Sequence, residues 1–336
     1  MNKIIKYTKA IYFMAGLALM TACNSDDYGE VGYGDDWDSE GYPVYGVQQD
    51  ALYLNVYLDG EKINDSGYPV HNWQDGETIG VYVTSGELGS PYLGDAATYN
   101  NIKSTYNEGY WRMDTKKVTL TTDSAVVYAY SPYQQELDPT AWLIDSRTGD
   151  VFMYGTHAAP QTAVVYGDMI AKVILNQTQS LLDIRIRKEP DCMEELILDG
   201  IYLKKINPSG TNDTDPANGL PVTGTVNIQT GELTYASYGE YKREHLRYTL
   251  TNEYTNDNRV LIPVLPYDIQ GNDVEIVFVV NGVEMSLSLD QRKDWNVGMR
   301  NVYSVSLTGS SASMDVLIKP WEDINNDLVI QDKPRD

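Results

Sequence analysis

The stretch VEIVFVVNGVEMSLSL, residues 274–289, is the clearest structural signal in the sequence. Two strongly apolar runs flank Asn281 and Gly282, the residue pair preferred at the centre of a type I′ turn. A two-residue turn of this type joins neighbouring antiparallel strands. The stretch therefore predicts a hairpin of two apolar β-strands.

The same period-two pattern appears from residue 51 onward. Leu52, Leu54 and Val56 fall on one face of a predicted strand over residues 51–58, and the turn at Asp59-Gly60 ends it. Gly, Pro, Asp or Asn residues bound the other short apolar runs, as they do between strands. Further strands are predicted at residues 78–84, 117–121, 125–130, 182–186, 303–307 and 314–318.

Two longer segments are predicted to fold back on themselves. Residues 196–203 would turn at Asp199-Gly200, and residues 225–235 would turn at Thr230-Gly231. Only residues 165–182 show helical periodicity.

Short strands spaced by turns along the whole chain predict an all-β protein built of β-sandwiches. The chain is longer than one core of ordinary size, so we expect two domains. The rhythm of the pattern restarts near residue 170. We therefore expect an N-terminal sandwich over residues 47–170 and a C-terminal sandwich over residues 171–336.

The first residues are typical of an export signal. Three lysines and no acid precede an apolar run at residues 10–20, which is too short to span a bilayer. Met20-Thr21-Ala22-Cys23 resembles the lipobox of bacterial lipoproteins. We expect residues 1–22 to be removed and Cys23 to carry the lipid, with palmitate among its acyl chains. The alternative is an ordinary secretory signal that contains a cysteine.

The residues after Cys23 predict where the protein is displayed. Asn24-Ser25-Asp26-Asp27 resembles a surface-export signal of Bacteroides-type bacteria. Residues 23–46 contain seven acids and no Lys or Arg, a composition too polar and repulsive to build a core. We expect an acidic flexible tether and a location on the outer membrane, lipid-anchored and surface-exposed.

The mature chain is strongly acidic. Loss of residues 1–22 would leave 22 basic residues against 48 acids, a net charge near −26. Such a surface repels phosphates and anionic headgroups, which argues against a nucleic-acid partner and against peripheral membrane binding. Cys192 is the only other cysteine, so lipidation of Cys23 excludes an intramolecular disulfide.

Five short phrases follow one another along the chain. They are WQDGETIGVY at 73–82, VYAYSPY at 127–133, GDMIA at 167–171, WNVGMRNVY at 295–303 and IKPW at 318–321. In this order, and behind a lipobox, they resemble the fimbrillin family, the lipoproteins that form or accompany the thin pili of Bacteroidetes. One departure is that NQTQS at 176–180 stands where the family often has a histidine, which leaves the subfamily open.

The resemblance implies tandem β-sandwiches and a non-catalytic fimbrial subunit, or a fimbrillin-like accessory lipoprotein. Its partners would be other fimbrial subunits and a host or bacterial surface ligand. In polymerising members, a trypsin-like protease removes the first strand, and the terminal strand of a neighbouring subunit fills the groove.

The first basic residue after Cys23 is Lys62, so proteolytic maturation of this chain would cut there. Without that cut, the subunit would stay lipid-anchored and accept no donor. The predicted donor strand is Leu328, Val329 and Ile330; the alternative is that these residues form a final edge strand of their own sandwich.

The sequence predicts no catalytic chemistry. His71, His157 and His245 lie far apart in different sequence neighbourhoods, and motifs of hydrolases, metalloproteases and nucleotide-binding proteins are missing. We therefore expect no enzyme, no cofactor and no metal site. Asp213 and Asp215 could hold Ca²⁺, but they lack the ligand spacing of an EF-hand, so a solvated turn rich in Asx residues is favoured.

Two further possibilities remain open. Asp123-Ser124-Ala125 resembles the O-glycosylation acceptor of these bacteria, although Ser124 could simply begin a strand. A second function is a lipid-anchored glycan-binding module of a nutrient-uptake system, because β-sandwiches and surplus tyrosines would also suit it. Exposure of Trp37, Trp111 or Trp142 at one end of a sandwich would favour that function.

Overall fold

The computed structural model describes residues 52–59, 62–63, 69–70, 72–114, 118–157, 163–167, 169–270, 272–289 and 294–320. β-Strands dominate these residues, so the predicted all-β class is confirmed. In this part of the chain, no helix is long and apolar enough to cross a membrane. The helical elements are short: η1 (Tyr92–Gly94), α2 (Ala96–Tyr99), η2 (Ser146–Thr148) and η3 (Asn256–Asn258).

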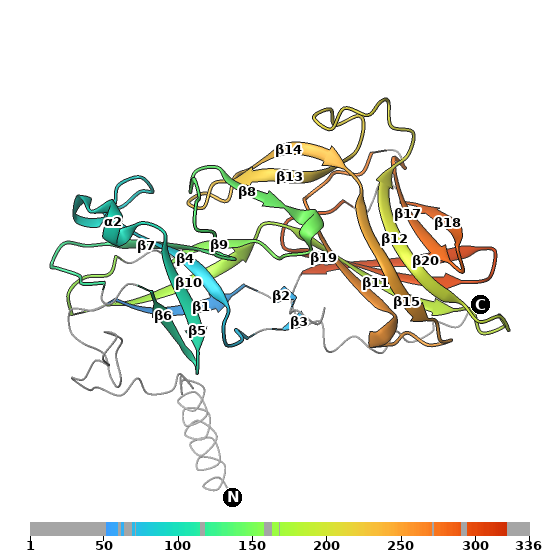
Figure 1. The fold of residues 1–336 in the computed structure, drawn as a ribbon, viewed down its shortest axis with the longest axis horizontal. Coiled ribbons are helices and arrows are strands. Elements are labelled where there is room, and N and C mark those ends of the chain that lie inside the picture. Colours follow the sequence, from blue (N-terminus) through green and yellow to red (C-terminus); the bar gives the residue numbers. More distant parts are fainter. Residues whose placement is uncertain are drawn as a thin grey trace, which may run out of the picture. The chain divides into compact units, whose positions relative to one another are not determined.

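One seven-stranded sheet forms from the first half of the chain (Figure 1). Its edge strand β1 pairs in parallel with β10, and the other neighbouring pairs are antiparallel. A separate two-stranded ladder joins β2 (Lys62–Ile63) to β3 (Pro69–Val70). The sheet order is β1 (Tyr53–Leu58), β10 (Ile170–Gln177), β9 (Met153–His157), β7 (Val126–Ser131), β4 (Thr78–Thr84), β5 (Ile102–Asn107) and β6 (Tyr110–Met113).

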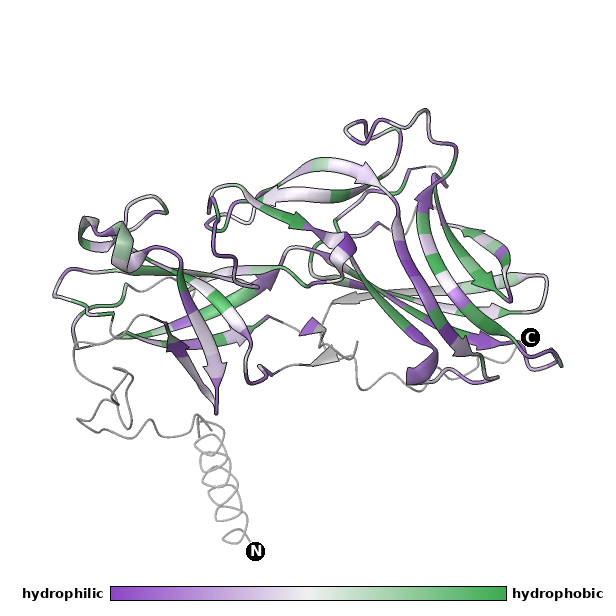
Figure 2. Cartoon of the chain, in the orientation of Figure 1, coloured by the Kyte–Doolittle hydropathy of each residue, from purple (hydrophilic) through white to green (hydrophobic). Residues whose placement is uncertain are grey.

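Two four-stranded sheets from the second half of the chain form a β-sandwich around one apolar core. Hydrophobic residues concentrate on these strands, whereas the connecting loops are mostly hydrophilic (Figure 2). One sheet is β16 (Arg259–Val264), β11 (Ser180–Lys188), β19 (Met299–Leu307) and β20 (Ala312–Pro320). The other is β15 (Tyr241–Thr249), β12 (Ile197–Lys205), β17 (Val274–Val280) and β18 (Val283–Ser288).

A small three-stranded sheet joins the two halves of the chain. β8 (Trp142–Asp145), green in Figure 1, pairs antiparallel with β13 (Leu220–Val226), and β13 also pairs with β14 (Leu233–Gly239). This sheet therefore combines one strand from the first half of the chain with two strands from the second half.

The side chain of Trp142 lies at the centre of a core that both halves share. Its ring centroid is 5.0 Å from that of Tyr130 and 5.5 Å from that of Phe152, both from the first half. The same cluster contains Val226 and Leu265 from the second half. We call this set the junction cluster; its buried members are Tyr82, Tyr128, Tyr130, Trp142, Ile144, Phe152, Val226, Ile228 and Leu265.

The hairpin predicted at residues 274–289 is confirmed. β17 and β18 are its strands, and Asn281 and Gly282 have φ of 51° and 75°, as a type I′ turn requires. The fold-back predicted at residues 225–235 is also present, because Val226 of β13 pairs with Leu233 of β14.

The helical periodicity of residues 165–182, which Asn176 and Gln177 interrupt, does not correspond to a helix. These residues contain β10 and the start of β11. Ala171, Val173 and Leu175 are buried and alternate with more exposed neighbours, which is the period of a strand. Tertiary pairing on both sides of β10 decides its conformation.

Two strand predictions also need correction. β12 runs straight through Asp199-Gly200, where the structure has a β-bulge rather than a turn. Glycine fits there because a Cβ on Gly200 would lie 3.0 Å from the Arg243 carbonyl oxygen. The other correction concerns the strand predicted at residues 117–121. Residues 118–120 lie outside the named strands, although Val118 and Leu120 are buried.

The division into two sandwiches near residue 170 stays a prediction. Hydrogen bonding groups β10, which begins at Ile170, with the first sheet. Contacts along the chain separate residues 1–48 from residues 49–336. A boundary drawn by strand pairing would therefore fall after Gln177.

Replacing Trp142 with alanine is expected to lower the free energy of unfolding by about 3 to 5 kcal/mol, because it empties the centre of the junction cluster. Leu143→Ala is the matched control, since Leu143 is the next residue in β8 and is 59% exposed, against 0% for Trp142. Urea unfolding followed by far-UV circular dichroism would measure both. Equal effects of the two changes would contradict the role assigned to Trp142.

Candidate functional sites

The first strand is bound along both edges. β1 forms a parallel ladder with β10 on one side. On the other side, the Leu52 amide donates to the Val118 carbonyl at 2.9 Å, and the Trp73 indole N–H donates to the Val56 carbonyl at 2.8 Å. The side chains of Leu52, Leu54 and Val56 are buried. Removal of β1 would therefore uncover an apolar groove beside β10.

Lys62, the predicted cleavage site, is enclosed. Its side chain is only 5% exposed and forms an ion pair with Glu77. Its ammonium also lies 4.9 Å from the ring centroid of Trp73, a cation–π contact. A trypsin-like protease must accommodate the lysine side chain in its own pocket, so cleavage after Lys62 requires this enclosure to open locally.

Trp73 is also part of an aromatic cluster beside the first strand. Its ring meets Trp111 edge-to-face with centroids 4.8 Å apart, and Trp111 lies 5.3 Å from Tyr106. Tyr106 and Trp111 are a cross-strand pair of the β5–β6 hairpin. The rings therefore hold that hairpin near Trp73, which in turn holds β1.

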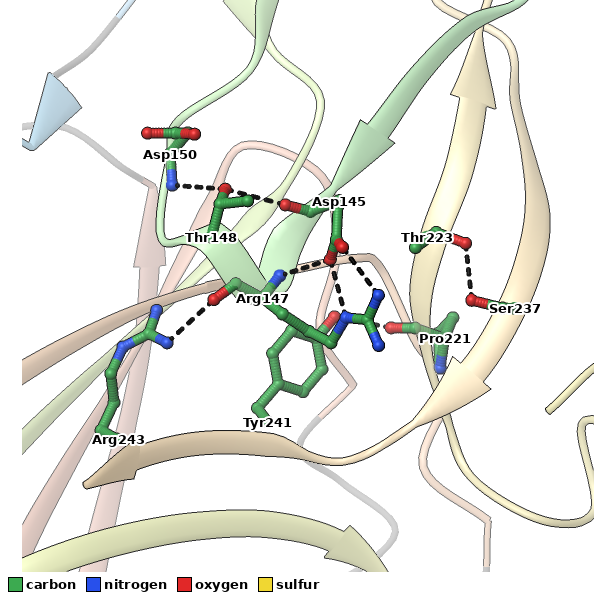
Figure 3. Close-up of polar contacts among 9 residues, drawn as sticks. All are labelled: Asp145, Arg147, Thr148, Asp150, Pro221, Thr223, Ser237, Tyr241 and Arg243. Carbon is green, nitrogen blue, oxygen red and sulfur yellow. Dashed lines mark hydrogen bonds and ion pairs between the residues drawn. The ribbon is translucent and has the colours of Figure 1, made fainter. Parts of the chain in front are cut away.

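A polar network lies where the two halves meet (Figure 3). Arg147 donates from Nε and Nη2 to the two carboxylate oxygens of Asp145, at 2.9 and 2.7 Å. The hydrogen bond from Arg147 holds the pKa of the Asp145 carboxyl below its ordinary value. Arg243, on β15, donates to the Arg147 carbonyl at 3.2 Å, and the buried Tyr241 donates to the Pro221 carbonyl at 2.6 Å.

Gln179, in the segment between β10 and β11, forms hydrogen bonds in the same region. Its side-chain amide donates to the Ser146 hydroxyl at 2.6 Å, and its carbonyl accepts from the Phe152 amide at 2.8 Å. Both Gln179 and Ser146 are fully buried. These bonds satisfy buried polar groups and fix the junction, so we assign them a structural role.

Three arginines surround one buried carboxylate on β11. Arg259 binds Asp183 with two hydrogen bonds of 2.7 and 2.9 Å. Arg300 and Arg185 each donate to the Asp183 Oδ2 atom at 3.0 Å. We call these four residues the arginine cluster.

Burial alone would raise the pKa of the Asp183 carboxyl. The hydrogen bonds from Arg259 and the charges of the three guanidinium groups outweigh that effect, so this pKa lies below its ordinary value. The carboxylate therefore stays ionised, and the cluster remains a charged group inside the protein.

The other predicted site residues are scattered. Ser124 is exposed just before β7, where it is accessible for glycosylation. Cys23 and the predicted donor residues Leu328, Val329 and Ile330 lie outside the described residues, as does His71. His157 is on β9 of the seven-stranded sheet, and His245 is on β15 of a different, four-stranded sheet.

The loop with Asp213 and Asp215 forms turns closed by its own side chains. The Asn212 side chain accepts from the Thr214 amide, and that of Asp215 accepts from the Ala217 amide. Over the described residues, no group of three or more His, Cys, Asp or Glu side chains could hold a metal ion. These contacts are those of an Asx-rich turn.

Sequence reasoning missed Trp73, Glu77 and Asp183 as residues with a particular role. Trp73 and Glu77 lie in the phrase at 73–82, which marked them without saying what they bind. Asp183 lies in LLDIRIRK, where alternation predicts that charged residues face water. The phrase at 73–82 therefore pointed to Trp73 and Glu77, whereas the alternation around Asp183 predicted the wrong environment for its side chain.

Comparison with known proteins finds a matching family and solved structures of similar fold. A family model described as fimbrillin-like matches residues 66–321. A candidate cell adhesion protein of Bacteroides uniformis ATCC 8492 is similar in structure, with a TM-score of 0.57 and 16% identity over 81% of this chain and 98% of that one. Another from Bacteroides ovatus ATCC 8483 has a TM-score of 0.57 and 15% identity over the same shares. No curated protein sequence matches the chain.

Replacing Asp183 with asparagine is expected to lower the free energy of unfolding by about 3 to 5 kcal/mol, because three buried guanidinium groups lose their carboxylate. Asp145→Asn is the matched control and should lower it by about 1 kcal/mol or less, since Asp145 and Arg147 are 34% and 51% exposed. Urea denaturation at pH 7 would compare them, and a smaller effect at Asp183 than at Asp145 would contradict this assignment.

Asp183 also predicts how stability depends on pH. Because its folded pKa is depressed, its contribution is complete above the unfolded aspartate pKa of about 3.9 and is lost as pH falls through the lower folded value. The difference in stability between the unsubstituted protein and Asp183→Asn should begin to shrink as pH falls below about 4 and should continue to shrink at lower pH. A difference that stays constant from pH 7 to pH 2 would refute the assignment.

Opening the enclosure of Lys62 should speed proteolysis there. Glu77→Gln removes the ion pair, so a lysine-specific protease is expected to release Ile63 as a new N-terminus at least several-fold faster, as measured by mass spectrometry. Asp114→Asn is the control, because Asp114 pairs with the more exposed Lys103 at 3.8 Å. An unchanged rate in Glu77→Gln would show that the ion pair does not limit access.

Proposed function

The chain belongs to the fimbrillin-like family, and from this we propose that it is a non-catalytic, surface-exposed fimbrial subunit or fimbrillin-like accessory lipoprotein that serves adhesion. The structurally similar candidate adhesion proteins of Bacteroides support this proposal through their common fold. Its partners are other fimbrial subunits and a ligand on a host or bacterial surface.

The observation that carries the proposal is the first strand. β1 contributes buried leucine and valine side chains, yet among the described strands its one ladder is with β10. The first basic residue of the mature chain, Lys62, follows four residues after β1 ends at Leu58. Cleavage after Lys62 would therefore release the strand as a unit and leave a groove of matching shape.

Assembly proceeds by β-strand exchange in this proposal. An extended donor from a neighbouring subunit gains main-chain hydrogen bonds from β10 and places alternate apolar side chains where Leu52, Leu54 and Val56 lay. Leu328, Val329 and Ile330 are the proposed donor, because they form a short apolar run that follows β20 along the chain.

Anchorage is part of the same proposal. Removal of the signal peptide leaves lipidated Cys23 at the outer membrane, and the acidic tether presents the folded part at the cell surface. If Lys62 is cut, the subunit leaves the anchor and enters the fimbrium. If it is not cut, the protein remains a membrane-bound anchor or accessory subunit.

The described residues do not favour the glycan-binding alternative. Trp142 is fully buried in the junction cluster, and Trp111 packs against Trp73 and Tyr106. Trp37 lies outside the described residues. The tryptophans placed by the structure thus stabilise the fold or the first strand.

N-terminal sequencing and intact mass of the protein released from the native cell surface test the proposal first. A start at Ile63 supports a polymerising subunit, and an intact lipidated Cys23 supports an anchor or accessory protein. A start at any other residue would contradict cleavage after Lys62.

Trimming after Lys62 is expected to convert the purified protein from monomers to multimers that resist sodium dodecyl sulfate, because the uncovered groove accepts a donor strand. Lys62→Gln blocks the cut without changing the groove and is the matched control. Gel electrophoresis and size-exclusion chromatography before and after protease treatment measure the change. A trimmed protein that stays monomeric would refute strand exchange.

A further inference from the structure

Strand β14 leaves one edge of the small three-stranded sheet without a partner strand. Its inner edge pairs with β13, and across the described residues no strand pairs with its outer edge (Figure 1). An edge of this kind carries unpaired main-chain donors and acceptors, to which the strand of another chain can add. The outer edge of β14 is therefore a candidate surface for pairing between chains.

The ladder with β13 determines which main-chain groups of β14 face outward. The Asn227 amide donates to the Glu232 carbonyl at 3.0 Å, so these two residues form a hydrogen-bonded pair beside the turn. Bonded and non-bonded pairs alternate along an antiparallel ladder. Leu233 and Tyr235 come one and three residues after Glu232, so they belong to non-bonded pairs. Their N–H and C=O groups therefore point away from β13.

β14 lacks the features that normally protect an edge strand from pairing, which are charged side chains, proline and irregular backbone. Its sequence, LTYASYG, contains no charged residue and no proline. Among the edge strands that the structure describes, only β1 shares this property, and Trp73 and the Val118 carbonyl bind the outer edge of β1. The register of β14 with β13 shifts only after Tyr235. Residues 233–235 thus form a regular, uncharged segment of free edge.

This segment is complementary to itself. If two β14 strands pair antiparallel about a twofold axis at Thr234, Leu233 of each copy lies opposite Tyr235 of the other copy. The outward N–H and C=O groups of both residues then form hydrogen bonds across the axis. An aliphatic side chain faces an aromatic ring, and the two Thr234 side chains lie side by side; both are favourable cross-strand pairs.

The charge of the chain favours a contact at this place. With 48 acids against 25 basic residues, two copies repel each other, so a contact between them must avoid acidic side chains. In the register about Thr234, the nearest acid of β14, Glu232, lies opposite Ala236 of the other copy. The two Glu232 side chains are then about 13 Å apart along the strands, which exceeds the screening length of about 8 Å at physiological ionic strength.

We propose that β14 is a self-association surface, through which two copies pair antiparallel about a twofold axis at Thr234 and join their three-stranded sheets into one. The contact is short, and interfaces below about 1,200 Å² are typical of weak, transient complexes. The dimer therefore forms at high local concentration and dissociates on dilution. The inference does not rest on the proposed function, because β14 and β1 belong to different sheets and no cleavage at Lys62 is needed.

Sedimentation equilibrium of the mature chain tests the proposal. All samples carry Cys23→Ser and Lys62→Gln, which exclude association through the lipid and through strand exchange. The test variants Thr234→Lys and Thr234→Glu each place two like charges opposite one another at the twofold axis, on a side chain that is exposed in the single chain. Ser286→Lys and Ser286→Glu are the matched controls, because Ser286 is an exposed residue of another edge strand, β18.

We expect a reversible equilibrium between monomer and dimer, with an association constant that falls about fivefold in either Thr234 variant and stays unchanged in the Ser286 variants. An equal mixture of Thr234→Lys and Thr234→Glu should recover the association, because opposite charges then meet at the axis. Added salt should strengthen the association of the chain without these changes, since it screens the repulsion between acidic copies. A chain that stays monomeric, or a mixture that associates no better than either variant alone, would overturn the proposal.

Hydrogen exchange of individual backbone amides gives a second measurement that needs no change in β14. The amides of Leu233 and Tyr235 should exchange more slowly as the protein concentration rises, because they become bonded only in the dimer. The Thr234 amide is the internal control, since it belongs to a bonded pair with β13 in the single chain. Exchange at Leu233 and Tyr235 that does not depend on concentration would also overturn the proposal.

Discussion

The union of the two halves through β8 is the constraint on which the rest of the structure depends. Without β8, the sheet beside it would be the two-stranded β13–β14 hairpin, and isolated hairpins have little stability in water. β8 also delivers Trp142 to the junction cluster, which has members from both halves. This strand of four residues therefore takes part in both the sheet and the apolar cluster through which the two halves stabilise each other.

The first strand contributes no residue to the junction cluster that joins the two halves, so its removal would leave that cluster in place. No residue of β1 belongs to the junction cluster, and the polar network of Asp145, Arg147 and Gln179 makes its described contacts elsewhere. β1 is held instead by the β10 ladder, by Trp73 and by burial of its own leucines. Its interactions are strong enough to order it, yet they are separate from those that hold the two halves together.

Local patterns were the reliable part of the sequence. Asn281-Gly282 specified a hairpin because the turn needs two residues of positive φ, and alternation located β1. The phrase from 295 to 303 marked a real contact, since the Trp295 indole donates to the Tyr303 hydroxyl at 3.0 Å inside the core. Family phrases thus identified core residues, which is why they predicted the fold better than they predicted sites.

Pairings between distant segments were beyond the reach of sequence patterns. Nothing in residues 51–58 indicates that β1 pairs in parallel with β10, or that β8 joins β13 across more than seventy residues. LLDIRIRK has the alternation of a half-exposed strand, yet residues on both of its faces are buried. The charged residues can be buried because the carboxylate of Asp183 forms ion pairs with arginine side chains. A period of two reports which side chains share a face, but not what covers that face.

The charge of the chain also limits how copies can associate. With 48 acids against 25 basic residues in the full sequence, two copies repel each other, and three of the arginines pair with Asp183 inside the protein. At physiological ionic strength this repulsion decays over about 8 Å. Main-chain hydrogen bonds and buried apolar side chains act at contact distance, where they can exceed it. Strand exchange is therefore compatible with the strong negative charge of the chain. Docking of charged surfaces between identical copies is opposed by that charge.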